Sequence, residues 1–364
     1  MKTYHLKLTA LSPIHIGTGQ DYEPTNYVMD IFRAKTHDES TKKYKMLFEF
    51  DEIEFYKSLN EDEKKEFKRL ANNDSPCARF QIYRFIHEKH KSLARKLAFK
   101  KVAVIDDVYE KYQEDIGKAV NNEGKENRIF DQFMIARTYA VPSTHRLVLP
   151  GSSIKGSIST AYQEQLYKQN GRDYEAVKRQ MLTPCNENLF KNFLISDANT
   201  NDKQASAIAT VVNVKRNIER TGISNRLEVV LTSKSFDTVV KVKEPLKFGE
   251  IASSCNEHYL PIFRSMFNDK TDSNTLREIN FGFVQQYKNY QPKSNQFLLR
   301  IGHHSGGRAT SIDGMREIKI KTQKGYETRK EETTIWLYKG NNGKFLPLGW
   351  VLCEYKEIIN ENID

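Results

Sequence analysis

The stretch Leu149–Ser157 holds the residue types best suited to bind a phosphate group. It reads Leu-Pro-Gly-Ser-Ser-Ile-Lys-Gly-Ser, which is typical of a strand end, a tight turn and the first turn of a helix. A helix start presents unpaired backbone N–H groups and the positive end of the helix dipole, which suit an anion. The candidate phosphate contacts are Gly151, Ser152, Ser153, Lys155 and Gly156. A capped helix without any ligand would show the same pattern.

The order of residues in this stretch excludes a Walker P-loop. That motif requires Gly-x-x-x-x-Gly-Lys-Ser/Thr. Gly151 and Gly156 have the required spacing, but Ser157 stands where the lysine must be, and Lys155 comes one residue early. The sequence therefore does not predict a nucleotide triphosphatase.

Two glycine-containing loops could bring the backbone close to a ribose-phosphate chain, because glycine lets peptide N–H groups approach phosphate oxygens. The first loop follows an alternating strand pattern and includes His15, Gly17, Thr18 and Gly19. The second follows an apolar run and includes Gly302, His303, His304, Gly306, Gly307 and Arg308. Histidine rings can stack on bases, and cations can contact phosphates. The further candidate cations are Arg137, Arg146, Lys215, Arg216 and Arg220. Ordinary turn chemistry is the alternative for each loop.

The same histidines raise the possibility of an enzyme. Metal-independent cleavage of RNA needs a general base near a 2′-OH, a general acid and a cation. His15 with Lys155, or His303 with His304, could supply these groups. However, an exposed histidine in a glycine loop is more often a binding residue, and no Gly-x-Ser-x-Gly nucleophile motif or pair of carboxylates at metal-binding spacing occurs. We predict no catalysis by the chain itself, no metal and no cofactor.

Composition favours a basic protein with a polyanionic partner. The chain has 364 residues, with 57 Lys and Arg against 47 Asp and Glu, which gives a formal net charge of +10. This length exceeds the usual size of a domain with a single hydrophobic core, so two domains are expected. Four scattered cysteines predict neither a zinc site nor disulfides and fit a reducing cytoplasm. The absence of a signal-like or membrane-length apolar run favours a cytoplasmic location without membrane contact.

Strand and helix patterns mix in both halves of the chain, which indicates an α+β fold rather than a doubly wound sheet. We expect an N-terminal domain over residues 1–190 and a C-terminal domain over residues 191–364. Mixed charge and helical spacing over about residues 51–130 predict a helical insertion in the first domain. The helix that begins near Gly151 should end at Asn170-Gly171.

Three segments together resemble one family. They are Leu-Ser-Pro-Ile-His-Ile-Gly-Thr-Gly at 11–19, Pro-Gly-Ser-Ser-Ile-Lys-Gly at 150–156, and the glycine loop at 302–307. The chain is similar to the RAMP superfamily, the ferredoxin-like RNA-binding subunits of CRISPR effector complexes. The resemblance implies tandem ferredoxin-like, RRM-like RAMP domains. Within the superfamily the chain most resembles the family of the fifth Csm subunit of type III-A complexes, with further similarity at Phe193–Asp197 and Pro347–Trp350.

This resemblance implies a non-catalytic subunit that caps the 3′ end of the guide (CRISPR) RNA and supports its maturation and complex assembly in antiviral defence. The implied partners are guide RNA and other RAMP subunits of the Csm complex, with target RNA and 3′-end trimming nucleases as further candidates. Ser159 departs from the family, because many relatives carry arginine there. The alternatives are an endoribonuclease acting on guide precursor or target RNA, another RAMP subunit such as the backbone subunit, and a protein-only scaffold.

Overall fold

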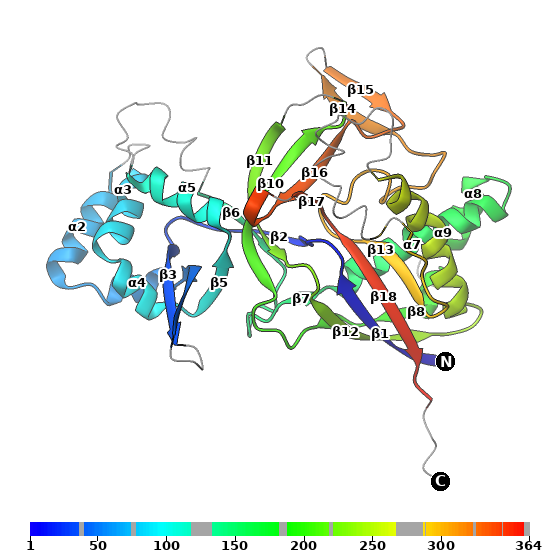
Figure 1. Cartoon of the computed structure of the whole chain (residues 1–364), viewed down its shortest axis with the longest axis horizontal. Helices are drawn as coiled ribbons and strands as arrows, with labels where there is room; N and C mark the ends of the chain where they lie inside the picture. The colour runs from blue at the N-terminus through cyan, green and yellow to red at the C-terminus, as the bar shows by residue number, and fades with distance from the viewer. Residues whose placement is uncertain are drawn as a thin grey trace, which may run out of the picture.

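The computed structural model describes most of the chain, with gaps at residues 36–39, 74–77, 118–132, 182–187, 218–220, 267–286, 288, 323–324, 344 and 360–364. Its described elements form two large sheets, two helices on one of them, and a helical region at the opposite end of the molecule (Figure 1). The predicted α+β class is confirmed. No helix in the described ranges is long and apolar enough to cross a membrane.

The first sheet joins the two ends of the chain. Its strand order is β13-β18-β1-β12-β9-β7, with β8 also paired to β12, and every pair is antiparallel. The strands are β1 (Lys2–Ala10), β7 (Val148–Leu149), β8 (Phe193–Ile195), β9 (Ala198–Asn199), β12 (Ser235–Val242), β13 (Gln296–Arg300) and β18 (Trp350–Glu357). The antiparallel order β18-β1-β12-β8, with a helix before β8 and another after β12, is that of a ferredoxin-like βαββαβ unit.

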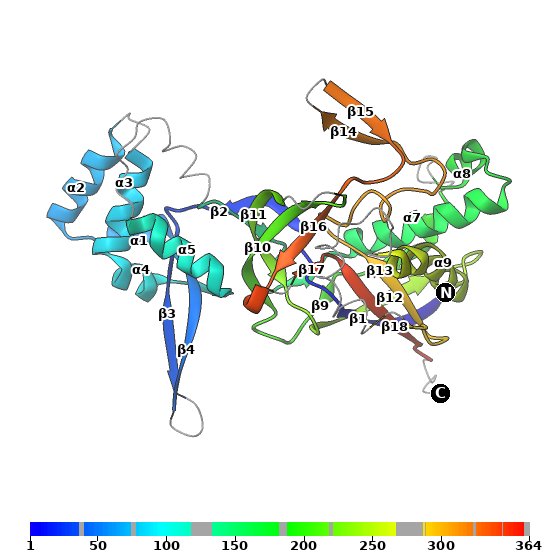
Figure 2. The same ribbon diagram turned by 45° about the horizontal axis from the view of Figure 1, so that its top comes forward.

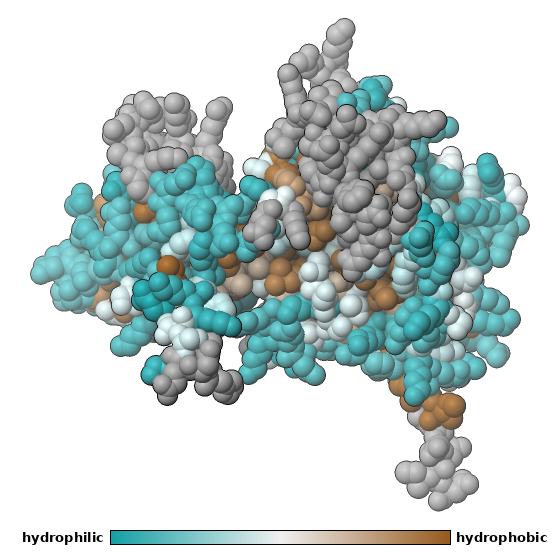
Figure 3. All heavy atoms as spheres, viewed as in Figure 1, coloured by the Kyte–Doolittle hydropathy of each residue, from teal (hydrophilic) through white to brown (hydrophobic). Residues whose placement is uncertain are grey.

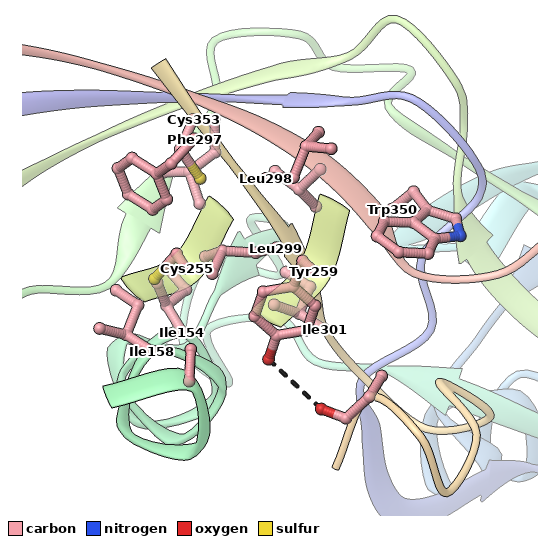
Figure 4. Packing of buried hydrophobic residues seen from close by; sticks show 14 of the residues in the cluster. Ile154, Ile158, Cys255, Tyr259, Phe297, Leu298, Leu299, Ile301, Trp350 and Cys353 are labelled. Atoms are coloured by element: carbon pink, nitrogen blue, oxygen red, sulfur yellow. Dashed lines mark hydrogen bonds between the residues drawn. The ribbon is translucent and has the colours of Figure 1, made fainter. Parts of the chain in front are cut away.

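Helices α7 (Gly151–Gln169) and α9 (Phe248–Ser265) cover one face of this sheet (Figure 2). Ile154 and Ile158, four residues apart on α7, pack with Leu299 and Trp350 in one buried cluster (Figure 4). The short helix α8 (Tyr174–Met181) follows α7. As predicted, α7 ends at Asn170, and Gly171 then adopts a φ of +64°.

The second sheet has the order β2-β6-β11-β10-β5-β4-β3, and β16 joins it through β10 and carries β17. The strands are β2 (Gly17–Tyr22), β3 (Tyr27–Lys35), β4 (Thr41–Glu49), β5 (Lys100–Val104), β6 (Ile135–Thr138), β10 (Ser206–Lys215), β11 (Thr221–Val230), β16 (Thr334–Lys339) and β17 (Phe345–Pro347). A separate two-stranded ribbon consists of β14 (Ile318–Thr322) and β15 (Gly325–Arg329).

Strand pairing crosses the predicted domain boundary at residue 190. Leu6 of β1 pairs with Thr238 of β12 on one side and with Tyr355 of β18 on the other. In the second sheet, β5 pairs with β10. Both sheets therefore contain strands from each side of residue 190, and the domain boundary there stays a prediction. Alternation along a strand reveals which face is buried but not which strand lies beside it.

The region from residue 51 onwards is largely helical, as predicted, and has its own small core. Its helices are α1 (Glu52–Lys57), α2 (Glu61–Ala71), α3 (Ala78–Arg84), α4 (Lys91–Leu97) and α5 (Asp106–Gly117), with a π-helical turn at Phe85–Lys89. Phe55, Leu70 and Phe85 pack with Phe48 of β4 in a separate cluster. The region is not purely helical, because β5 lies within it and pairs with β4 and β10. On the face in Figure 3, hydrophilic residues cover these helices.

Candidate nucleic-acid interface

A groove of about 680 Å³ lies where α7, the second sheet and the loop after β13 meet. We call it the α7 groove. It is lined by His15, Ile16, Gly17, Gly19, Ala136, Ser153, Gly156, Ser157, Thr160, Asn225, Leu227, Gly302, His303, His304, Ala309 and Thr310. The three segments that the sequence singled out, at 15–19, 151–157 and 302–307, thus all contribute residues to one site.

Helix α7 offers the groove small side chains and bare backbone. Ser153, Gly156, Ser157 and Thr160 recur at intervals of three or four residues and so lie on one face of the helix. A Cβ atom added at Gly156 would meet no heavy atom within 4 Å, so this glycine faces open space. A polymer backbone can therefore approach the helix closely at Gly156. Sequence reasoning did not identify Ser157 and Thr160, although their helical spacing from Ser153 was a usable signal.

The first N–H group of α7 is already occupied by the protein. The Gly151 N–H donates to Asp197 Oδ1 at 2.7 Å. A Cβ atom at Gly151 would lie 2.8 Å from the Ile195 carbonyl oxygen and 2.9 Å from that of Ser196. Close packing against the strand end at 193–197 therefore explains Gly151, and the carboxylate of Asp197 acts as the cap of the helix. Ser152 is exposed beside this cap and does not line the groove.

Lys155 does not line the α7 groove, in contrast to its predicted role as a phosphate contact. Its ammonium group donates to the Phe193 carbonyl oxygen at 2.7 Å and lies 5.7 Å from the centre of the Phe190 ring. Burial lowers the pKa of this half-buried lysine. The side chain thus links α7 to the segment before β8. Ser159, where many relatives have arginine, accepts a hydrogen bond from Gln163 Nε2 at 3.0 Å.

The first and second glycine loops are joined through His15. Its carbonyl oxygen accepts a hydrogen bond from the His303 N–H at 2.8 Å. Gly302 has a φ of +89°, and a Cβ atom there would lie 2.4 Å from the same His15 oxygen, so no other residue fits. The buried His15 ring donates from Nδ1 to the Glu228 carbonyl oxygen at 2.8 Å. Burial lowers the pKa of His15, and the neutral ring then keeps Nε2 as an acceptor.

Three aromatic rings, which we call the ring ladder, pack together at the groove: His303 and His304 line it and meet edge-on, and Trp336, outside the lining, packs against His304. The His304 ring centre lies 4.2 Å from that of His303 and 4.2 Å from that of Trp336. Burial and the neighbouring histidines lower the pKa of His304 to about 3, so this ring is neutral at physiological pH. His304 also has a φ of +68°, a strained conformation of the kind found at functional sites. The exposed His303 ring is the open end of the ladder, and sequence reasoning did not identify Trp336.

The loop at 17–21 stands out from its strand pair. The register between β2 and β6 shifts between Gly17 and Asp21, so the residues between them bulge. Gly19 has a φ of +76° and open space around it, and Thr18 Oγ1 accepts a hydrogen bond from the Gln20 N–H at 3.0 Å. Of these exposed residues, Gly17 and Gly19 line the α7 groove.

The predicted cation Arg137 is held inside the protein. Its Nη1 lies 2.5 Å from the carboxylate of the buried Glu49, and its Nε donates to the Asp21 carbonyl oxygen at 2.9 Å. Its guanidinium carbon lies 4.1 Å from the centre of the Tyr22 ring. Arg137 thus connects β6, β2 and β4. These contacts within the protein explain the presence of an arginine at this position without a contact to RNA.

The cations near the second glycine loop are also engaged. Arg216 is buried 3.6 Å from a Glu332 oxygen, and Arg308 donates to Ser265 Oγ at 3.0 Å. Added Cβ atoms at Gly306 and Gly307 would lie 2.5 Å from Glu332 and 2.7 Å from Ile318, respectively. Neither these glycines nor these arginines line the groove. Lys215 is exposed at the end of β10, and Arg220 lies outside the described residues.

The α7 groove continues along β11. A second hollow of about 930 Å³ shares Ala136, Asn225 and Leu227 with it and reaches Lys339 and α5. At this far end, Lys339 pairs with Asp107 at 3.2 Å. The two hollows together form an elongated path, whose shape suits a single strand more than a compact small molecule.

The lining of the α7 groove is made of uncharged polar, apolar and histidine residues. Among the described residues that line it, there is no carboxylate, lysine or arginine. In the described part of the chain, no group of three or more His, Cys, Asp or Glu side chains is placed to hold a metal ion. What the groove offers is imidazole rings, hydroxyls and close backbone, which suit the bases and ribose-phosphate chain of single-stranded RNA.

Comparisons with known proteins agree with this geometry. The family model of the RAMP superfamily matches residues 7–301. A chain of the cryo-EM structure of a Csm–crRNA–target RNA ternary complex from a type III-A CRISPR–Cas system superposes with a TM-score of 0.61 at 14% identity, covering 96% of this chain and 100% of that one. The crystal structure of T. onnurineus Csm5 superposes with a TM-score of 0.54 at 14% identity, covering 95% and 99%. No curated protein sequence matches the chain.

Proposed function

The chain belongs to the RAMP superfamily, and from this membership we propose that it is an RNA-binding subunit of a type III-A (Csm) CRISPR complex. Its proposed role is that of the fifth Csm subunit, which caps the 3′ end of the guide RNA and supports guide maturation and complex assembly. The fold shared with two solved Csm structures supports this proposal. The proposed partners are guide RNA, target RNA, other RAMP subunits and 3′-end trimming nucleases.

The observation that carries the proposal is the convergence of three distant segments on the α7 groove. Gly156 leaves the helix backbone open, and Gly302 lets the two loops touch. The ring ladder beside them supplies a surface for stacking, in which His304 is neutral at physiological pH. Such a site holds single-stranded RNA by shape, stacking and backbone contacts rather than by reading its sequence.

We propose a non-catalytic role because the described lining of the α7 groove lacks the cation that RNA cleavage would require. The Nδ1 of His15 donates to the Glu228 carbonyl oxygen. The low pKa of His304, about 3, makes it a weak base. Lys155, the cation once paired with His15 in the enzyme hypothesis, is bonded to the Phe193 carbonyl oxygen. Among the described residues that line the groove, no lysine or arginine stands beside the histidine pairs considered for RNA cleavage.

The test uses the Csm complex assembled from its subunits and a guide-RNA precursor. Gly156→Val places a branched side chain in the open groove, and Gly249→Val in α9 is the matched control, because a Cβ atom at Gly249 also meets nothing within 4 Å. We expect complexes with wild-type or control subunit to contain guide RNA with defined 3′ ends. Complexes with Gly156→Val should lose this subunit from the RNA and yield heterogeneous 3′ ends.

Two results would contradict the proposal. If Gly156→Val and the control behave alike in RNA retention and 3′-end length, the groove does not hold the guide. If the purified wild-type chain cuts guide precursor with multiple turnover and His15→Ala abolishes cutting while RNA still binds, the chain is an endoribonuclease.

A further inference from the structure

A second pocket lies on the opposite face of the second sheet from the α7 groove. It has a volume of about 360 Å³ and lies between β5, the turn at 140–147 and the loop at 200–206. Leu227 of β11 lines the α7 groove, whereas the next residue, Glu228, lines the second pocket. Because neighbouring residues of a strand point to opposite faces, the two sites are separated by the sheet itself.

The carboxylates of this pocket are already satisfied. Glu228 is buried and accepts hydrogen bonds from Tyr22 and Ser206, each at 2.8 Å, with Lys100 3.4 Å away. Asp202 pairs with Lys234 and accepts the Gln204 N–H. These negative charges therefore do not neutralise the cations at the rim.

Arg146 and Lys203 at the rim of the second pocket have no acidic partner among the described residues. The guanidinium of the exposed Arg146 donates to Asn199 Oδ1 at 2.9 Å, which is a neutral amide oxygen. Lys203 is exposed on the facing loop. Neither side chain forms an ion pair with any carboxylate that the structure describes. An anion entering the pocket would meet both without displacing an existing ion pair.

An exposed aromatic pair stands beside these cations. The His145 ring centre lies 4.9 Å from that of Phe99, whose exposed fraction is 49%. His145 has a φ of +53° and is held there by a closed turn, in which its N–H donates to the Val141 carbonyl oxygen at 2.8 Å. A strained histidine whose ring is tilted by 30° against an exposed phenylalanine offers ring faces that suit the flat face of a base.

We propose that the second pocket binds one nucleotide of single-stranded RNA, with its phosphate on Arg146 and Lys203 and its base on the Phe99–His145 pair. The cations alone would also fit an acidic peptide of a neighbouring subunit, but the aromatic pair favours a base. This site is independent of the α7 groove, so either one can bind RNA if the other does not.

The experiment measures binding of a fluorescent single-stranded RNA to the full chain by anisotropy over a range of salt concentrations. The double variant Arg146→Ala/Lys203→Ala should bind about 10-fold more weakly. The slope of log K against log salt should fall in magnitude by about 1.4, from about 0.7 for each of two lost phosphate contacts. Phe99→Ala should weaken binding about 5-fold with the slope unchanged, and Phe99→Trp should restore it.

The matched control is Lys7→Ala/Lys241→Ala, which removes two exposed lysines from the first sheet and should leave affinity and slope unchanged. Thermal unfolding shows whether the variants are folded. If a variant with Arg146→Ala does not fold, the single variant Lys203→Glu is used to test the proposal. Unchanged RNA affinity and slope in the rim variants would overturn the proposal. Poly-glutamate serves as a probe for an acidic peptide, and rim variants that lose binding to it while they still bind RNA like wild type would also overturn the proposal. The effect of Gly156→Val in the same assay reports separately on the α7 groove.

Discussion

His258 Nδ1 of α9 lies 2.7 Å from a carboxylate oxygen of Glu164 on α7, and both side chains are buried. The same carboxylate oxygen accepts the Asp313 N–H at 2.9 Å, and the other accepts from Lys168 at 2.7 Å. His258 Nε2 also lies 3.5 Å from the Ala309 carbonyl oxygen. This network connects the two helices to the end of the second glycine loop and so positions the wall of the α7 groove.

Removing the carboxylate of this network should destabilise the protein strongly. Glu164→Ala leaves the buried His258 without its acceptor and removes the acceptor of the Asp313 N–H, so we expect a loss of about 3 kcal/mol or more. Urea unfolding followed by circular dichroism measures this change. Glu175→Ala, which removes an exposed glutamate of α8 paired with Lys178, should change stability by less than about 0.5 kcal/mol. Equal effects of both substitutions would show that the buried network contributes little.

The same carboxylate predicts how stability depends on pH. Burial alone would raise the pKa of Glu164, but its hydrogen bond to His258, the charge of His258, and its hydrogen bonds to Lys168 and the Asp313 N–H outweigh burial and lower this pKa from 4.5 to about 2. Because the folded-state pKa is depressed, the stabilisation is fully present above pH 4.5 and is lost as the pH falls through about 2. The difference in unfolding free energy between wild type and Glu164→Gln should shrink over this interval. A difference that stays constant from pH 6 to pH 2 would contradict the lowered pKa.

Gly156→Ala should separate stability from RNA binding. Replacing a helical glycine by alanine stabilises a helix by about 0.5–1 kcal/mol where space allows, and Gly156 faces open space. The new methyl group would nevertheless enter the α7 groove, so RNA affinity should fall although the melting temperature rises. Gly249→Ala in α9 should raise stability alone. An RNA affinity that rises or stays constant in Gly156→Ala would show that RNA does not approach this backbone.

Trp336 should contribute to RNA binding through the ring ladder. Trp336→Ala removes the support under His304, and loss of one stacked base costs about 1–3 kcal/mol, or roughly 10-fold or more in affinity. Trp336→Phe keeps an aromatic ring and should retain most of the affinity. Because His304 stays neutral down to a pH of about 3, its stacking contribution should not change between pH 5 and pH 8. Anisotropy titrations of both variants at these two pH values test the prediction.

Lys155→Ala should leave RNA binding unchanged, because its ammonium group is bonded to the Phe193 carbonyl oxygen rather than directed at the groove. The slope of log K against log salt should match that of wild type. A decrease of about 0.7 in the magnitude of this slope would instead mean that Lys155 contacts one phosphate in the complex.

Much of the local structure follows from the sequence. Alternation of apolar and polar residues places Leu6 and Leu8 on the buried face of β1, and the Pro-Gly turn and Asn170-Gly171 bracket α7 as predicted. The three segments that resemble the RAMP superfamily contribute to the α7 groove. These features depend on residues close together in the chain, where periodicity and turn chemistry act directly.

Tertiary structure decided which groups the long side chains meet. Lys155 and Arg137 looked available for phosphate, yet one is bonded to Phe193 and the other to Glu49. A long cationic side chain pairs with the acceptor that tertiary packing places beside it. In both cases that acceptor lies far away in the sequence. The same reason explains why Trp336 was not predicted as part of the ladder and why β1 pairs with strands from the other end of the chain. Sequence determined the faces and turns of this protein, and only long-range packing determined their partners.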